Sequence, residues 1–187
     1  MYKVGDMMHV IIAGAARSGK TTLSLMLNEH GFTHYKMDSI KRGICEAYSL
    51  KYDDWKDVSP IMCTIINRII EDNKTDTNYL KENYLFDSPF LSPKDIKMIN
   101  TENTKVIFLG YSRISVDEMV KLIRKHDLEN YWTNKKSDEE LLKETYENIE
   151  FSKYVEEECK KYGIKYYDTS IDRENVLKEI LNDIIEK

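Results

Sequence analysis

The chain has 187 residues, of which 41% are hydrophobic and 33% are charged, and its formal net charge at pH 7 is -5. This length suits one domain around one core, and the composition excludes collagen-like, low-complexity and disordered chains. The negative charge argues against binding to a long nucleic acid, although a basic cleft within an acidic protein still attracts an anionic ligand.

Five short segments with strand character alternate with helical patterns along the chain. The expected strands cover residues 9–13, 33–37, 84–87, 105–110 and 164–167. The fourth segment is a continuous apolar run, which is typical of a strand covered on both faces. Such alternation indicates an α/β fold, with a parallel sheet between two layers of helices.

Helices are expected between these strands and after the last of them. Ser115 and Ser137 are each followed three positions later by a glutamate, which is the capping-box spacing at a helix start. Gly163 is a natural helix end. The segment 111–137 is rich in charge and poor in strand character, so we expect a mobile lid there. The expected helices cover residues 21–29, 40–48, a stretch beyond 53 with an apolar stripe at 61–69, 93–99, a stretch after 115, 137–163 and 176–184.

The strongest signal lies between the first strand and the first helix, where the sequence G-A-A-R-S-G-K-T matches the phosphate-loop pattern G-x-x-x-x-G-K-[ST]. Glycines let backbone amides turn toward phosphate oxygens, and the N-terminus of the helix adds positive potential. Lys20 is expected to reach the β- and γ-phosphates of ATP, and Thr21 to offer its hydroxyl to Mg²⁺. Arg17 either lies over the phosphates or points outward. The predicted nucleotide-binding residues are Gly14, Ala15, Ala16, Arg17, Ser18, Gly19, Lys20, Thr21 and Thr22.

This loop and its context resemble the P-loop small-molecule kinases, a group that includes nucleoside monophosphate kinases, shikimate kinase, chloramphenicol phosphotransferase and the polynucleotide kinase domain. The resemblance implies a three-layer P-loop NTPase fold with sheet order 2-3-1-4-5 and a helical lid. It also implies an ATP- and Mg²⁺-dependent phosphotransferase that acts on a hydroxyl or phosphate of a small molecule. The alternative is a regulatory nucleotide-binding protein in which slow ATP hydrolysis switches a contact with a partner.

Two kinds of P-loop protein fit less well. The guanine motif N-K-x-D of GTPases is missing, because the nearest string, at residues 134–138, has one residue too many and no strand before it. Nucleoside monophosphate kinases usually carry Asp-Gly-Phe-Pro-Arg after the third strand, whereas residues 87–91 read Asp-Ser-Pro-Phe-Leu. An ordinary adenylate kinase is therefore not expected.

The resemblance also suggests residues for the acceptor, the metal and the transferred phosphoryl group. Asp38 is expected to accept a proton from a substrate hydroxyl, and Arg42, one helical turn later, to hold an anionic substrate group. Asp87 resembles the carboxylate that holds Mg²⁺ through water, although the two aspartates can exchange these roles. Arg113 is the first candidate for a lid arginine that neutralises the transferred phosphoryl group, and Arg124 is the second.

Several of these residues have an ordinary structural alternative. Asp38 can cap the next helix, and Asp87 can form a turn before Ser-Pro. The segment Asp168, Thr169 and Ser170 resembles the one that lies along the adenine base in this family, but it can also be a helix cap.

The remaining features suggest a cytoplasmic protein of one domain, residues 1–187. Cys45, Cys63 and Cys159 form an odd set without C-x-x-C spacing, so we expect reduced core thiols and no zinc site. Apolar runs stay far below the roughly 20 residues of a membrane span, and residues 1–6 show no export signal.

Overall fold

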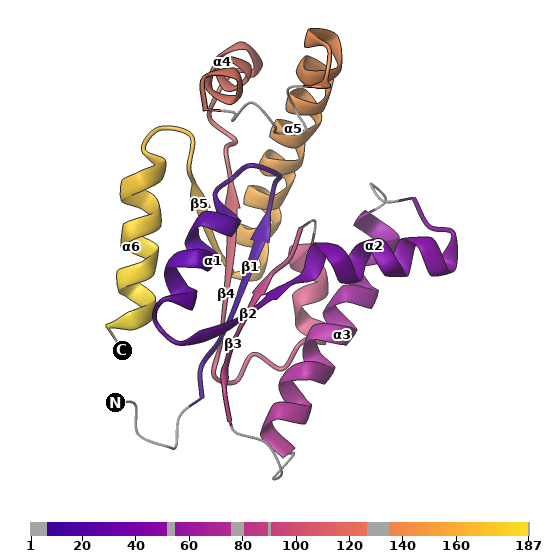
Figure 1. Ribbon diagram of the computed structural model, residues 1–187, viewed down its shortest axis with the longest axis vertical. Helices are drawn as coiled ribbons and strands as arrows, with labels where there is room; N and C mark the ends of the chain where they lie inside the picture. The colour runs from indigo at the N-terminus through magenta and orange to yellow at the C-terminus, as the bar shows by residue number, and fades with distance from the viewer. Residues whose placement is uncertain (1–6, 52–54, 76–80, 90, 127–134, 187) are drawn as a thin grey trace.

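A computed structural model describes residues 7–51, 55–75, 81–89, 91–126 and 135–186. Five strands form one parallel sheet in the order β2-β3-β1-β4-β5 (Figure 1). The strands are β1 His9–Gly14, β2 Phe32–Lys36, β3 Asn83–Asp87, β4 Thr104–Gly110 and β5 Lys165–Asp168. The parallel sheet and its strand order confirm the prediction.

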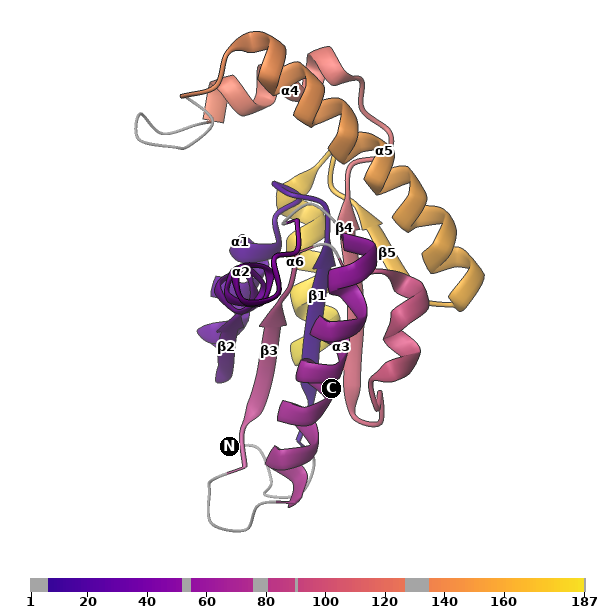
Figure 2. The ribbon, with the colours of Figure 1, turned by 90° about the vertical axis from the view of Figure 1, so that its right-hand side faces the viewer.

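Helices cover both faces of the sheet (Figures 1 and 2). They are α1 Lys20–Asn28, α2 Met37–Tyr48, α3 Trp55–Thr75, the 3₁₀ helix η1 Pro93–Met98, α4 Val116–His126, α5 Asp138–Tyr162 and α6 Arg173–Ile185. Helices α1 and α6 pack on one face, while α3, η1 and α5 pack on the other. The predicted three-layer architecture is therefore confirmed.

Strand β1 lies at the centre of the sheet and is buried along its whole length. Because successive side chains of a strand point to opposite faces, Val10 and Ile12 belong to the core under α1 and α6. Ile11 and Ala13 belong to the core under α3 and α5. Each large side chain buried in this way stabilises the fold by about 1.5–3 kcal/mol. The strand thus fixes the position of the phosphate loop that follows it.

Gly14 ends β1 in a conformation that a side chain cannot adopt here. Its φ is +119°, and an added Cβ would lie 1.9 Å from the carbonyl oxygen of Leu109 in the neighbouring strand. That carbonyl also accepts a hydrogen bond from the Ala15 amide at 3.1 Å, so it is held in place.

We therefore expect Gly14→Ala to lower the free energy of unfolding by at least about 3 kcal/mol, as backbone strain adds to a steric overlap. Urea denaturation followed by circular dichroism measures this loss. Gly31→Ala is the matched control, because Gly31 has φ +86° but nothing within 4 Å of an added Cβ. It should cost only about 1–2 kcal/mol. Equal losses in the two variants would contradict the clash with Leu109.

The ends of the long helices follow the predicted signals. Ser137 and Glu140 form a complete capping box at the start of α5, and Gly163 ends that helix in the left-handed conformation, with φ 68°. Ser115 and Glu118 bond reciprocally in the same way before α4. The second predicted strand differs, because β2 already ends at Lys36 and Met37 begins α2. Asp38 consequently lies in the first turn of α2 and not at the end of a strand.

Helix α4 and the first turns of α5 extend beyond the carboxyl ends of the strands (Figure 2). The side chain of Arg124 joins them, with an ion pair of 2.7 Å to Asp138 and a hydrogen bond of 3.1 Å to the carbonyl of Lys136. This region contains the predicted lid, 111–137, of which residues 127–134 lie outside the described residues. The described part of that segment is largely helical.

Two further features of the sequence can be compared with the structure. Cys45, Cys63 and Cys159 are buried and free, as predicted. Burial raises the pKa of the Cys63 and Cys159 thiols to about 12, so both stay protonated. Over the part of the chain that the structure describes, no helix combines the length and apolarity needed to cross a membrane.

Candidate active site

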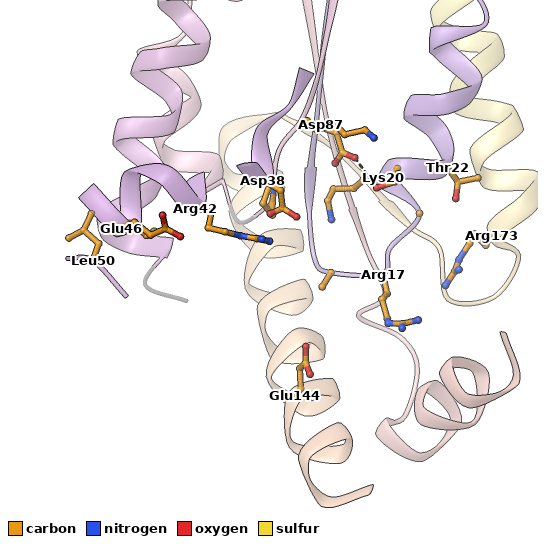
Figure 3. A pocket seen from close by; sticks show the side chains of 16 residues that line it. Arg17, Lys20, Thr22, Asp38, Arg42, Glu46, Leu50, Asp87, Glu144 and Arg173 are labelled. Carbon is orange, nitrogen blue, oxygen red and sulfur yellow. Dashed lines mark hydrogen bonds between the residues drawn. The ribbon is translucent and has the colours of Figure 1, made fainter. Parts of the chain in front are cut away.

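A cavity of about 980 Å³ opens at the carboxyl ends of β1, β2 and β3, where parallel sheets generally bind their ligands. The phosphate loop and the start of α1 form its floor. Helix α2 forms one wall, and the start of α6 contributes to the other. Figure 3 shows the side chains that line this cavity.

Lys20 lies where the phosphate loop ends and α1 begins. It is the first residue of α1, its side chain is buried, and its Nζ donates to the carbonyl of Ala15 at 2.6 Å. Burial lowers the pKa of Lys20, while the charges of Asp87 and Asp38 raise it. Figure 3 shows both carboxylates near the lysine, as one shared reaction requires.

Two side chains that follow β4 and β5 hold the phosphate loop in shape. The hydroxyl of Tyr111, after β4, donates to the carbonyl of Ala16 at 2.8 Å. The hydroxyl of Thr169, after β5, lies 3.0 Å from the carbonyl of Ser18 and 3.1 Å from that of Gly110. Burial raises the pKa of Tyr111, so its hydroxyl remains a donor. The loop is thereby fastened to two strands of the sheet.

The two residues predicted to serve Mg²⁺ lie side by side. The hydroxyl of Thr21 donates to Oδ2 of Asp87 at 2.9 Å. The side chain of Asp87 is 11% exposed, and the same oxygen lies 3.9 Å from Nε2 of His34. Burial lowers the pKa of His34 although Asp87 raises it, which favours the neutral imidazole. A hydroxyl and a carboxylate are ligands that a hard cation accepts, so this pair fits Mg²⁺.

One face of α2 forms the opposite wall of the cavity. Asp38, Arg42, Cys45 and Glu46 recur at helical spacing along this face, and all four line the cavity. The N-cap of α2 is Lys36, so Asp38 is not the helix cap that the sequence offered as an alternative. Figure 3 shows Asp38 and Arg42 directed toward Lys20.

The structure does not bring the predicted lid arginines into this cavity. Arg113 is 63% exposed and forms an ion pair of 3.1 Å with Glu156, in a separate depression beside β5. Arg124 is bound to Asp138. The arginines that line the cavity beside the phosphate loop are instead Arg17 and Arg173. Arg173 was missed because nothing in its local sequence marks it, and it reaches the cavity only through the packing of α6.

The predicted adenine segment lies against the phosphate loop but does not line the cavity. Thr169 holds the loop, as described above. Asp168 accepts hydrogen bonds from the amide of Ser170 at 2.9 Å and from the hydroxyl of Ser112 at 2.8 Å. Burial acts to raise the pKa of Asp168, but these bonds outweigh it and lower the pKa. The N-cap of α6 is Asp172, so none of the three residues is that cap.

Comparisons with known proteins found similarity at the level of structure. No protein-family model and no curated protein matches the chain. Shikimate kinase from Bacteroides thetaiotaomicron shares its fold with a TM-score of 0.54 and 14% identity, over 96% of this chain and 97% of that one. Shikimate kinase from Acinetobacter baumannii, solved with shikimate, gives a TM-score of 0.54 and 11% identity, over 96% of this chain and 94% of that one. The chain therefore shares the fold of these two shikimate kinases.

Proposed function

We propose that this protein is an ATP- and Mg²⁺-dependent kinase that transfers a phosphoryl group to a hydroxyl or phosphate of a small molecule. The supporting observation is one cavity in which a phosphate-loop lysine, a hydroxyl–carboxylate pair suited to Mg²⁺ and a helix face carrying Asp38 and Arg42 meet. The likeness in fold to shikimate kinase agrees with a small acceptor.

On the nucleotide side, the amides of the phosphate loop bind the phosphate oxygens and Lys20 contacts the β- and γ-phosphates. In the structure Nζ of Lys20 is bonded to Ala15, so it exchanges that carbonyl for phosphate when ATP binds. Thr21 and Asp87 hold Mg²⁺, which neutralises charge on the phosphates. The segment from Asp168 to Ser170 lies near the base.

On the acceptor side, Asp38 receives the proton of the attacking hydroxyl. Arg42 lies one helical turn further along α2 and binds an anionic group of the acceptor, because a guanidinium pairs well with carboxylate or phosphate. The hydrogen bond between Thr21 and Asp87 supports Asp38 as the base and Asp87 as the metal ligand over the exchange of these roles, because it associates Asp87 with the metal-binding hydroxyl. The acceptor is thus a small molecule with a hydroxyl or phosphate and a second, negatively charged group.

The chain acts as one domain, and the described parts of the predicted lid, residues 111–126 and 135–137, close over the cavity when both substrates are bound. Helix α4 and the first turns of α5 project beyond the strand ends (Figure 2). Glu144 of α5 lines the cavity. Closure excludes water, which a kinase requires to prevent hydrolysis of ATP. Asp38 lines the cavity although its side chain is exposed, so its position agrees with an acceptor site, and the experiment below separates the kinase from the regulatory alternative.

ADP release from ATP and Mg²⁺ tests this function. The purified protein is screened against nucleosides, nucleotides, sugars, hydroxy acids and aminoglycoside-like alcohols, with Lys20→Met as the blank. We expect one class of acceptor to stimulate ADP release in the wild type and not in the blank, and anionic members to stimulate most. ATP binding without stimulation by any acceptor would favour the regulatory alternative, and no nucleotide binding would refute both.

A further inference from the structure

Arg17 occupies a strained position in the phosphate loop. Its φ is 62°, in the left-handed region that residues other than glycine rarely adopt. A glycine would adopt this conformation without steric strain, whereas an arginine bears that strain. Strain of this kind gathers at sites where ligands bind, and an observed outlier justifies asking what the side chain does.

Arg173 lies against the same loop from α6. It is the first residue of that helix, and a Cβ built on Gly19 would lie 3.6 Å from its Cδ. The stem of Arg173 therefore packs over the phosphate loop. Both Arg17 and Arg173 line the cavity, and Figure 3 shows them on the side of Lys20 that faces away from Asp38 and Arg42.

The two guanidinium groups lie on the same side of the cavity (Figure 3), and their like charges oppose each other. The pKa of Arg173 is lowered, first by loss of hydration. Tyr111 acts to raise this pKa, and the charge of Arg17 acts to lower it. Two cations held together beside a phosphate loop lose this repulsion when a polyphosphate lies between them, because each then faces negative charge. Each guanidinium group can also donate two parallel hydrogen bonds to the oxygens of one phosphate.

We propose that Arg17 and Arg173 form a two-arginine clamp on the polyphosphate of the bound nucleotide. The clamp is built from the phosphate loop and the start of α6, and not from the lid region that carries Arg113 and Arg124. This inference rests on the proposed function, since it takes the phosphate loop to bind a nucleotide. Because the clamp acts through charge, it favours ATP over ADP, and ADP over AMP.

Arg17→Gly tests the clamp, because the change removes the guanidinium and also relieves the backbone strain. Isothermal titration calorimetry with Mg-ATP, Mg-ADP and AMP gives the affinities, and differential scanning calorimetry gives Tm. We expect the Kd for ATP to rise about 10- to 100-fold, the size of a lost charge-assisted contact, and the Kd for AMP to change less. Tm should stay the same or rise.

Two further variants complete the test. Arg17→Gln keeps a long side chain in the strained conformation but removes its charge, so it should weaken ATP binding without raising Tm. Arg173→Gln should weaken ATP binding as well, and the double variant should lose less than the two single losses combined, since one arginine without the other has little to clamp.

Asn103→Gly is the matched control. Asn103 is also left-handed, with φ 59°, but its carbonyl bonds to the amide of His9 at the opposite end of the sheet. Its Tm should likewise stay the same or rise, while its affinity for ATP stays that of the wild type. If Arg17→Gly gains stability and binds ATP as tightly as the wild type, the clamp is refuted while the proposed function stands. If the wild type binds no nucleotide, the proposed function fails and the clamp with it.

Discussion

Lys20→Met is expected to lower kcat/KM for ATP by at least about 10²- to 10³-fold, the usual loss when a preorganised donor to developing charge is removed. The lysine stem is buried in the phosphate loop, with 8% of the residue exposed. Methionine replaces this stem with an unbranched apolar chain of similar length, so the packing is kept and only the ammonium group is lost. Steady-state kinetics with the acceptor found in the screen measure the effect.

The control for this variant is Lys178→Met on α6. Lys178 is an exposed lysine paired with Glu174 at 2.6 Å, and it lies outside the cavity. Its replacement should leave kcat/KM within about twofold of the wild type, because exposed ion pairs contribute little. Lys20→Met should also unfold at a temperature no lower than the wild type, since burying an ammonium is unfavourable. Substantial turnover by a folded Lys20→Met protein would rule out phosphate-loop catalysis.

Asp38→Asn is expected to lower kcat about 10²- to 10⁴-fold, the range for loss of a general base, with little change in ATP affinity. The amide has nearly the shape of the carboxylate but does not accept the proton of the acceptor hydroxyl. Removing a negative charge close to Lys20 leaves the site at least as attractive to phosphate. Rapid-quench kinetics give the rate of the chemical step, and titration with ATP gives the Kd.

Glu46→Gln is the matched control for Asp38→Asn. Glu46 lies on the same face of α2, two turns further along, and also lines the cavity. Its replacement removes the same charge from the same wall, but at a position further from Lys20. We expect a change in KM for the acceptor and a smaller loss of kcat. Equal losses of kcat in the two variants would show that the charge of the wall matters and that Asp38 is not the base.

The parts of the protein that the sequence predicted well depend on local chemistry. The phosphate loop is recognised from eight consecutive residues. The strands are recognised from apolar runs, because a strand between two helix layers has apolar neighbours on both of its faces. The helix signals at Ser137 and Gly163 are equally local, since a cap bonds to amides or carbonyls of its own turn. The order of the sheet came from the resemblance to a family, and the structure confirms it.

The parts that the sequence did not predict depend on contacts between distant segments. The positive charges between residues 111 and 137 suggested a lid arginine, but Arg113 turns to Glu156 of α5, which lies 43 positions later. Arg173 carries no motif, and its place beside Gly19 follows from the packing of α6 on α1. Asp38 lies in a helix because β2 ends at Lys36, which pairs with Asp87 at the end of β3.

The hydrogen bonds from Tyr111 and Thr169 to the phosphate loop have a thermodynamic consequence. Ordering the backbone of a loose loop costs about 1–2 kcal/mol per residue in conformational entropy, and a ligand that ordered residues 14–19 would have to supply several times that amount. Here the free energy of folding has already supplied it, through the bonds from Tyr111 and Thr169, which follow β4 and β5, to the loop. The free energy of the contacts between the loop and a phosphate therefore appears almost entirely as affinity, because little of it is used to order the loop.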